Sequence, residues 1–236
     1  MQTPEWIARC IPAHEAVLDL GVLVWDSWYV GPENDFSKEK WKELRTPLYR
    51  PQVAHRDIRK QCKSLDSWMP DIQYISIATA TPSDLEEVRR YCSDLLRIMA
   101  AHGQQIRTSN TQFHLRLAVF VSDDLSIDWP WDWTWNEIQN VLNALASPMP
   151  IIGIVYNELE QGWRVEIFAS QTNLFMRESD YDTGEERRLI ACNRESIVQQ
   201  ASRLKAGIPA KLVLLEEGLN QQGLFGCQAT GSPHKP

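Results

Sequence analysis

The sequence lacks the features that mark several large classes of protein. None of its apolar runs approaches the roughly 18 residues that a membrane-spanning helix needs. The segment Met1–Trp6 carries an acidic side chain and no basic one, which is untypical of a secretory signal. The five cysteines are an odd number without close pairs, so a secreted disulfide framework is not expected. We therefore expect a cytoplasmic protein with reduced thiols.

The composition that is present is that of an ordinary globular protein. Hydrophobic residues make up 43% and charged residues 23% of the 236 residues, which excludes a globally disordered chain. A chain of this length can bury a single large core. We expect one domain over residues 1–222, with any subdivision near 69–70, and a disordered tail over 223–236.

Hydrophobic periodicity predicts helices and strands in mixed order. The clearest helix follows Thr81 and Pro82 and closes at Gly103, because apolar residues between them recur at every third or fourth position. A capping box of Thr134 and Glu137 starts a second helix that reaches about residue 146. Strands are expected at five places: 17–30, 71–79, 113–121, 151–156 and 163–168.

The remaining segments predict further helices and one long loop. The further helices are expected near 5–10, 37–45, 53–63 and 193–207. Residues 170–188 are expected to form a polar loop, and 211–215 suit either a last strand or a short helix. Because βαβ units do not alternate regularly, the expected class is α+β, with a mixed, largely antiparallel sheet of about five strands packed against helices.

Charge is distributed unevenly along the chain. The net charge of −7 argues against a general nucleic-acid binder. Phe36–Lys63 holds nine basic and three acidic residues, whereas Asp123–Glu186 holds thirteen acidic residues and two arginines. A solvated surface is the ordinary interpretation of acidic segments. The sharper interpretation is an electric field that attracts a basic partner and speeds its association.

Four of the ten tryptophans fall on alternate residues: Trp129, Trp131, Trp133 and Trp135. Alternate residues of an extended chain share a face. We expect Trp133 and Trp135 to cover the core, and either Trp129 or Trp131 to stay partly exposed beside aspartates. Aromatic side chains surrounded by carboxylates are typical of protein-binding hot spots, although they can also stack on sugars or on a cationic ligand.

Signals for catalysis or metal binding are weak. Asp123, Asp124 and Asp128 lie at a strand end where Mg²⁺ ligands can gather, but a solvated loop is the commoner explanation of such acids. Glu178–Glu186 departs from a calcium loop, because no glutamate closes a twelve-residue frame. We therefore expect no catalytic residue, no bound metal ion and no cofactor.

The chain resembles bacterial immunity proteins, the cognate inhibitors of polymorphic or type VI secreted toxins. The resemblance is one of general character over most of the chain, which is small, acidic, rich in tryptophan and α+β. Its most suggestive stretches are Asp128–Trp135 and Glu178–Glu186. The resemblance implies a tight one-to-one complex with a toxin domain, often a nuclease whose basic cleft is matched by the inhibitor's carboxylates.

We predict a non-catalytic inhibitor that binds a cognate basic toxin enzyme and contacts neither nucleic acid nor membrane. The predicted partner-binding residues are Asp123, Asp124, Asp128, Trp129, Trp131, Asp132, Glu178, Asp180, Tyr181, Asp182, Glu185 and Glu186. The basic stretch Phe36–Lys63 leaves open which face binds. Two alternatives are a metal-dependent hydrolase or nuclease whose acids converge from separate strands, and a structural subunit or adaptor.

Overall fold

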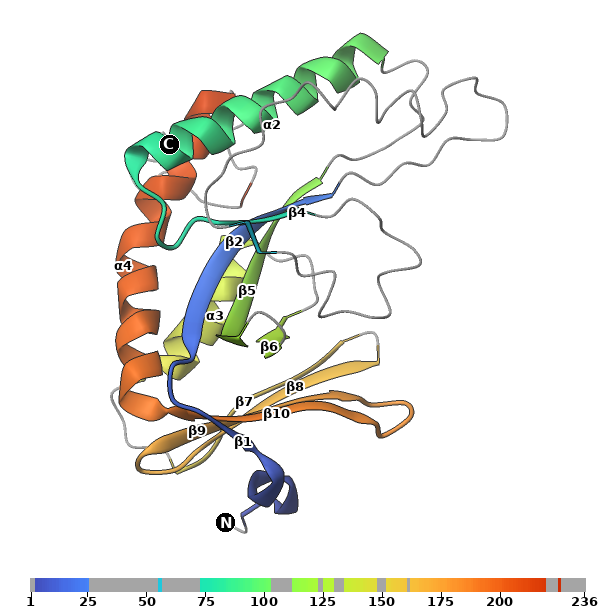
Figure 1. Cartoon of the computed structure of the whole chain (residues 1–236), viewed down its shortest axis with the longest axis vertical. Helices are drawn as coiled ribbons and strands as arrows, with labels where there is room; N and C mark the ends of the chain where they lie inside the picture. Colours follow the sequence, from blue (N-terminus) through green and yellow to red (C-terminus); the bar gives the residue numbers. More distant parts are fainter. Residues whose placement is uncertain are drawn as a thin grey trace, which may run out of the picture. The chain divides into compact units, whose positions relative to one another are not determined.

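The structure is a computed structural model (Figure 1) that describes residues 3–25, 55–56, 73–102, 112–122, 125–129, 134–147, 152–160, 162–219 and 225. Contacts between α-carbons divide the chain into two compact units. Unit 1 comprises Met1–Leu20 and Leu115–Ile208, and unit 2 comprises Gly21–His114 and Pro209–Pro236. The subdivision predicted near 69–70 lies outside the described residues.

A mixed five-stranded sheet, the first sheet, lies in unit 1 (Figure 1). Its strands, in spatial order, are β1 (Ile11–Ala13), β10 (Glu186–Asn193), β9 (Asn173–Asp180), β8 (Trp163–Ala169) and β7 (Gly153–Glu160). β1 runs parallel to β10, and the other neighbours are antiparallel. The expected α+β class with a mixed, largely antiparallel sheet is confirmed.

The polar loop expected over 170–188 is wrong, because most of this segment forms β9 and the start of β10. In β9 the buried side chains of Leu174, Met176 and Glu178 alternate with partly exposed ones over most of the strand. One of the three inward positions is a charged residue, so the apolar alternation is too short to stand out. Cross-strand pairing on both sides nevertheless holds the segment extended.

Two helical segments of unit 1 contact the first sheet, one at β10 and the other at β7. At β10, the short 3₁₀ helix η1 (Glu5–Arg9) buries Trp6, and the guanidinium of Arg177 lies 5.3 Å from the centre of its ring. Unit 1 also contains α3 (Trp135–Leu145), which begins at the predicted capping box of Thr134 and Glu137. This helix buries five apolar side chains: Trp135, Ile138, Val141, Leu142 and Leu145.

A second sheet has the strand order β3-β4-β2-β5-β6 within the described part of the chain. These strands are β2 (Val17–Trp25), β3 (His55–Arg56), β4 (Gln73–Ser76), β5 (Gln112–Ser122) and β6 (Leu125–Asp128). The helix expected over 53–63 is wrong at its described residues, because His55 and Arg56 pair with Ile75 and Tyr74 of β4. The other residues of that helix, and the helix expected over 37–45, lie outside the described ranges.

Unit 2 contains α2 (Pro82–His102), as expected from its periodicity. Its first turn is fixed by Asp84, whose Oδ2 accepts hydrogen bonds from the Thr81 N–H (2.7 Å) and hydroxyl (2.8 Å). The inward face of α2 buries Leu85, Val88 and other apolar side chains. This burial, added to the N-terminal cap, accounts for the stability of a long helix.

The helix α4 (Arg194–Leu219) is longer than expected. Its predicted end at Gly207 is wrong, and it continues through Pro209, so residues 211–215 are helical. Proline removes one backbone donor, but the apolar stripe continues with the buried Ile208, Leu212 and Leu215. Within the described residues, no helix is both long enough and apolar enough to cross a membrane.

Candidate functional site

The predicted partner-binding residues fall into three groups. Four lie outside the described residues: Asp123, Asp124, Trp131 and Asp132. Three are buried in unit 1: Asp128, Trp129 and Glu178. The other five are gathered at the turn between β9 and β10: Asp180, Tyr181, Asp182, Glu185 and Glu186.

We call residues 180–186 the acidic turn. Asp180 organises its backbone, because one carboxylate oxygen accepts hydrogen bonds from the N–H groups of Asp182 and Thr183, each at 3.0 Å. Both bonds lower the pKa of Asp180, and the bond from Thr183 has the larger effect. The Gly184 N–H donates to the Asp180 carbonyl (2.9 Å), and Gly184 has a φ of +72°, which favours glycine. The acidic turn therefore has a defined backbone conformation.

The neighbouring turn between β7 and β8 supports the acidic turn. The Tyr181 N–H donates to the carbonyl of Gly162 at 2.7 Å. Gly162 has a φ of +80°, and a Cβ at this position would lie 2.7 Å from a carboxylate oxygen of Asp182. On β10, Arg187 pairs with Asp180 (3.2 Å), and its guanidinium lies 3.6 Å from the centre of the Trp163 ring.

The side chains of the acidic turn differ in how available they are to a partner. Tyr181 is 56% exposed, and the flanking Asp182 and Glu185 are also exposed. Glu186 differs, because its carboxylate pairs with Arg9 (2.7 Å) and Arg177 (3.2 Å). Among the described residues of the predicted surface, Tyr181, Asp182 and Glu185 are therefore the accessible ones.

Trp129 requires a correction, because its side chain is fully buried. The backbone N–H of Trp129 donates to the Leu117 carbonyl of β5 at 3.1 Å, so the backbone pairing of β6 continues by one residue. The indole then packs inside unit 1, edge-on to the Tyr156 ring with 6.2 Å between the ring centres. Trp129 is not a surface anchor. The burial of Trp135 agrees with the core role predicted for it.

Asp128 and Glu178 also require correction, because they belong to an interior charge cluster with Arg116 and Arg188. Asp128 accepts from Arg116 at 2.7 Å and lies 3.8 Å from Arg188, whose Nη1 donates to Glu178 at 3.0 Å. The side chains of Arg116, Asp128 and Glu178 are each at most 7% exposed. Opposite charges explain how these polar groups tolerate burial.

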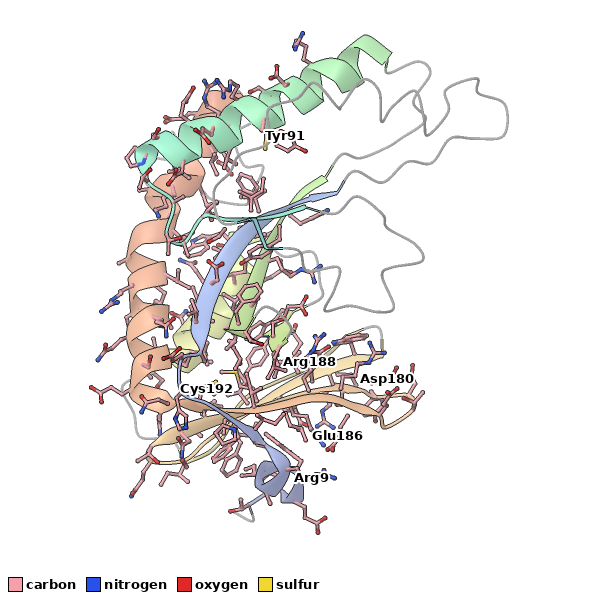
Figure 2. All side chains as sticks on the ribbon, viewed as in Figure 1. Arg9, Tyr91, Asp180, Glu186, Arg188 and Cys192 are labelled. Carbon is pink, nitrogen blue, oxygen red and sulfur yellow. The ribbon has the colours of Figure 1, made fainter. Side chains whose placement is uncertain are left out.

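Figure 2 shows how β10 separates two groups of charges, with Arg188 and Glu186 directed to opposite faces of the first sheet. Arg188 reaches the interior cluster, whereas Glu186 meets Arg9 of η1. Sequence reasoning missed both Arg116 and Arg188 as partners of the predicted acids. Only Arg116 carried a signal, since it lies in a strand that was expected and a buried arginine needs an interior anion.

Burial raises the pKa of Glu178 from 4.5 to about 7. The nearby Asp128 adds to this rise, while Arg188 and Arg187 oppose it. One oxygen of Glu178, Oε1, is buried and receives no hydrogen bond from any described residue. Glu178 can therefore hold a proton near neutral pH, but it lies inside the protein.

The described cysteines offer no reactive thiolate. Cys10, Cys92 and Cys192 are free, and burial raises their pKa values to about 11, 12 and 12 respectively. Each thiol is therefore protonated at neutral pH, which makes it a poor nucleophile. No group of three or more His, Cys, Asp or Glu side chains in the described ranges is arranged to hold a metal ion.

Comparisons of this chain with protein-family models, with curated proteins and with solved structures found no match.

Proposed function

We propose that the protein is a non-catalytic cytoplasmic inhibitor that binds a basic toxin enzyme through the acidic turn. The first candidate for this enzyme is a nuclease. One observation carries the proposal: Tyr181 is mostly exposed on the same turn as the exposed carboxylates of Asp182 and Glu185, and the backbone of this turn is already fixed. The free thiols of Cys10, Cys92 and Cys192 are compatible with a reducing compartment.

The chemistry of the acidic turn suits a basic protein surface. Tyrosine supplies a large, rigid contact area and is enriched at interface hot spots. The carboxylates of Asp182 and Glu185 can steer a positively charged partner and pair with its Lys or Arg side chains. Because hydrogen bonds already hold the turn, little conformational entropy is lost on binding. These properties favour a partner-binding role for Tyr181, Asp182 and Glu185.

The test is co-expression with the protein encoded by the gene immediately upstream, in a bacterial host whose growth is followed. We expect that protein to arrest growth and the wild-type chain to relieve the arrest. The variant Tyr181→Ala/Asp182→Asn/Glu185→Gln is expected to lose the relief, because it removes the aromatic contact and two charges.

The matched control is Leu214→Ala, which truncates an exposed apolar side chain of α4 that is not part of the acidic turn. This control should relieve the arrest as well as the wild type does. Absence of relief by the wild-type chain contradicts the inhibitor proposal. Full relief by the triple variant, with an unchanged melting temperature, contradicts the assignment of the acidic turn.

A further inference from the structure

We propose that the protonation state of Glu178 regulates how firmly the β9–β10 hairpin is held, and with it the presentation of the acidic turn. The link to presentation rests on the proposed function, whereas the effect on the hairpin does not. The geometry that carries the proposal is the interior charge cluster, which joins strands of both sheets within unit 1.

The cluster connects the hairpin to β5 and β6, at residues that belong to unit 1. Glu178 of β9 and Arg188 of β10 are cross-strand neighbours. Arg116 of β5 and Asp128 of β6 come from the second sheet and pair with each other. Arg188 lies between the two acids, 3.0 Å from Glu178 and 3.8 Å from Asp128, so the pairing of one acid depends on the charge of the other.

The two acids are not equivalent sites for a proton. Asp128 has an arginine near each of its carboxylate oxygens. Glu178 has Arg188 at Oε2, whereas its Oε1 is buried without a donor from the described residues. An ionised oxygen without a donor is costly in the interior, and protonation removes that cost. The proton therefore belongs on Glu178.

The surroundings of Glu178 determine the direction of the effect. Its cross-strand neighbour on β8, Val165, is buried and apolar. Four charged side chains face it directly or through a partner: Asp128 on β6, Arg188 and Arg187 on β10, and Arg116 on β5 through Asp128. Loss of the proton places a second anion beside Asp128 in a site that water does not solvate. Ionisation therefore favours separation of the hairpin from β5 and β6.

The difference in the pKa of Glu178 between the folded and unfolded protein sets the pH range over which the stability changes. The pKa of Glu178 is about 7 in the folded protein and near its ordinary value of 4.5 when the chain is unfolded. The stabilisation from its protonated form is therefore complete below pH 4.5 and is lost as the pH rises through 7. Asp180, two residues further along β9, begins the acidic turn. A looser hairpin changes how this turn is presented.

The test compares urea unfolding of the wild type and Glu178→Gln from pH 5 to pH 8. Glutamine keeps the shape of the protonated acid but cannot ionise. We expect the unfolding constant of the wild type to rise roughly tenfold to a hundredfold more than that of Glu178→Gln over this range. The control Glu195→Gln, an exposed position at the start of α4, should follow the wild type. Parallel curves for wild type and Glu178→Gln overturn the proposal.

Two measurements on the isolated protein complete the test and need no partner, so they stand even if the inhibitor proposal fails. Carbon NMR of the Glu178 side-chain carboxyl should give a titration midpoint near 7, and a midpoint below 5 overturns the proposal whether or not the glutamine variant folds. Amide exchange of Gly184, corrected for its intrinsic pH dependence, should show less protection at pH 8 than at pH 6 in the wild type. Equal protection at both pH values overturns the link to the acidic turn.

Discussion

Asp128 and Arg116 form the closest ion pair of the interior charge cluster, with 2.7 Å between Oδ2 and Nη1 and almost no exposure of either side chain. Burial of a guanidinium is tolerated here because an anion lies beside it. A pair of this kind adds little stability compared with apolar packing, but loss of one partner leaves the other charge uncompensated. Single substitutions in the cluster should therefore have unequal effects.

Asp128→Asn should destabilise the protein strongly, by about 3 kcal/mol, because it leaves Arg116 buried without its anion. Glu178→Gln should be much milder at pH 7, since Glu178 is already partly protonated there. Urea unfolding of both variants at pH 7 provides the comparison. Equal losses of stability in the two variants would show that the acids have equivalent roles.

At the residue scale, solvent exposure could be predicted from the sequence only where it follows from local structure. Tyr181 and Asp182 lie on a short turn at the end of a hairpin, and such residues face solvent in most folds. Asp128, Trp129 and Glu178 were misplaced because their burial depends on distant strands. The partners of Asp128, Arg116 and Arg188, are 12 and 60 residues away in the sequence, which no local pattern reveals.

Among the elements, those with strong local signals were predicted best. α2 and α3 combine N-terminal capping residues with helical apolar periodicity. β9 and β10 were missed because their sequences mix charged and apolar residues, and only pairing with β8 and β1 makes them strands. The length of α4 was misjudged because Gly207 and Pro209 usually end a helix, whereas here the buried stripe extends past both.

The continuity of α4 gives a prediction at this scale. Gly207 lies inside the helix without the positive φ of a helix-ending glycine, and a Cβ built there meets no atom within 4 Å. Gly207→Ala should therefore raise the free energy of unfolding by about 0.5–1 kcal/mol. Thermal or urea unfolding tests this, and a loss of stability would mean that the helix ends at Gly207.

At the scale of the whole molecule, composition and periodicity were enough to predict an α+β protein with a mixed, largely antiparallel sheet. The division of the strands between two sheets was not predictable in the same way, because it is decided by long-range pairings such as β1 with β10. The described acidic residues of the second half include two kinds of charge. Asp128 and Glu178 are compensated inside unit 1, whereas Asp182 and Glu185 face solvent.

The central claim is that the exposed acidic turn binds a basic partner, and the affinity of the Tyr181→Ala variant tests it most directly. Calorimetric titration of the purified upstream-encoded protein with wild type and Tyr181→Ala gives the two dissociation constants. For an interface hot spot we expect the variant to bind at least about thirtyfold more weakly, with an unchanged melting temperature because the Tyr181 ring is exposed. Dissociation constants within twofold of each other would contradict the account.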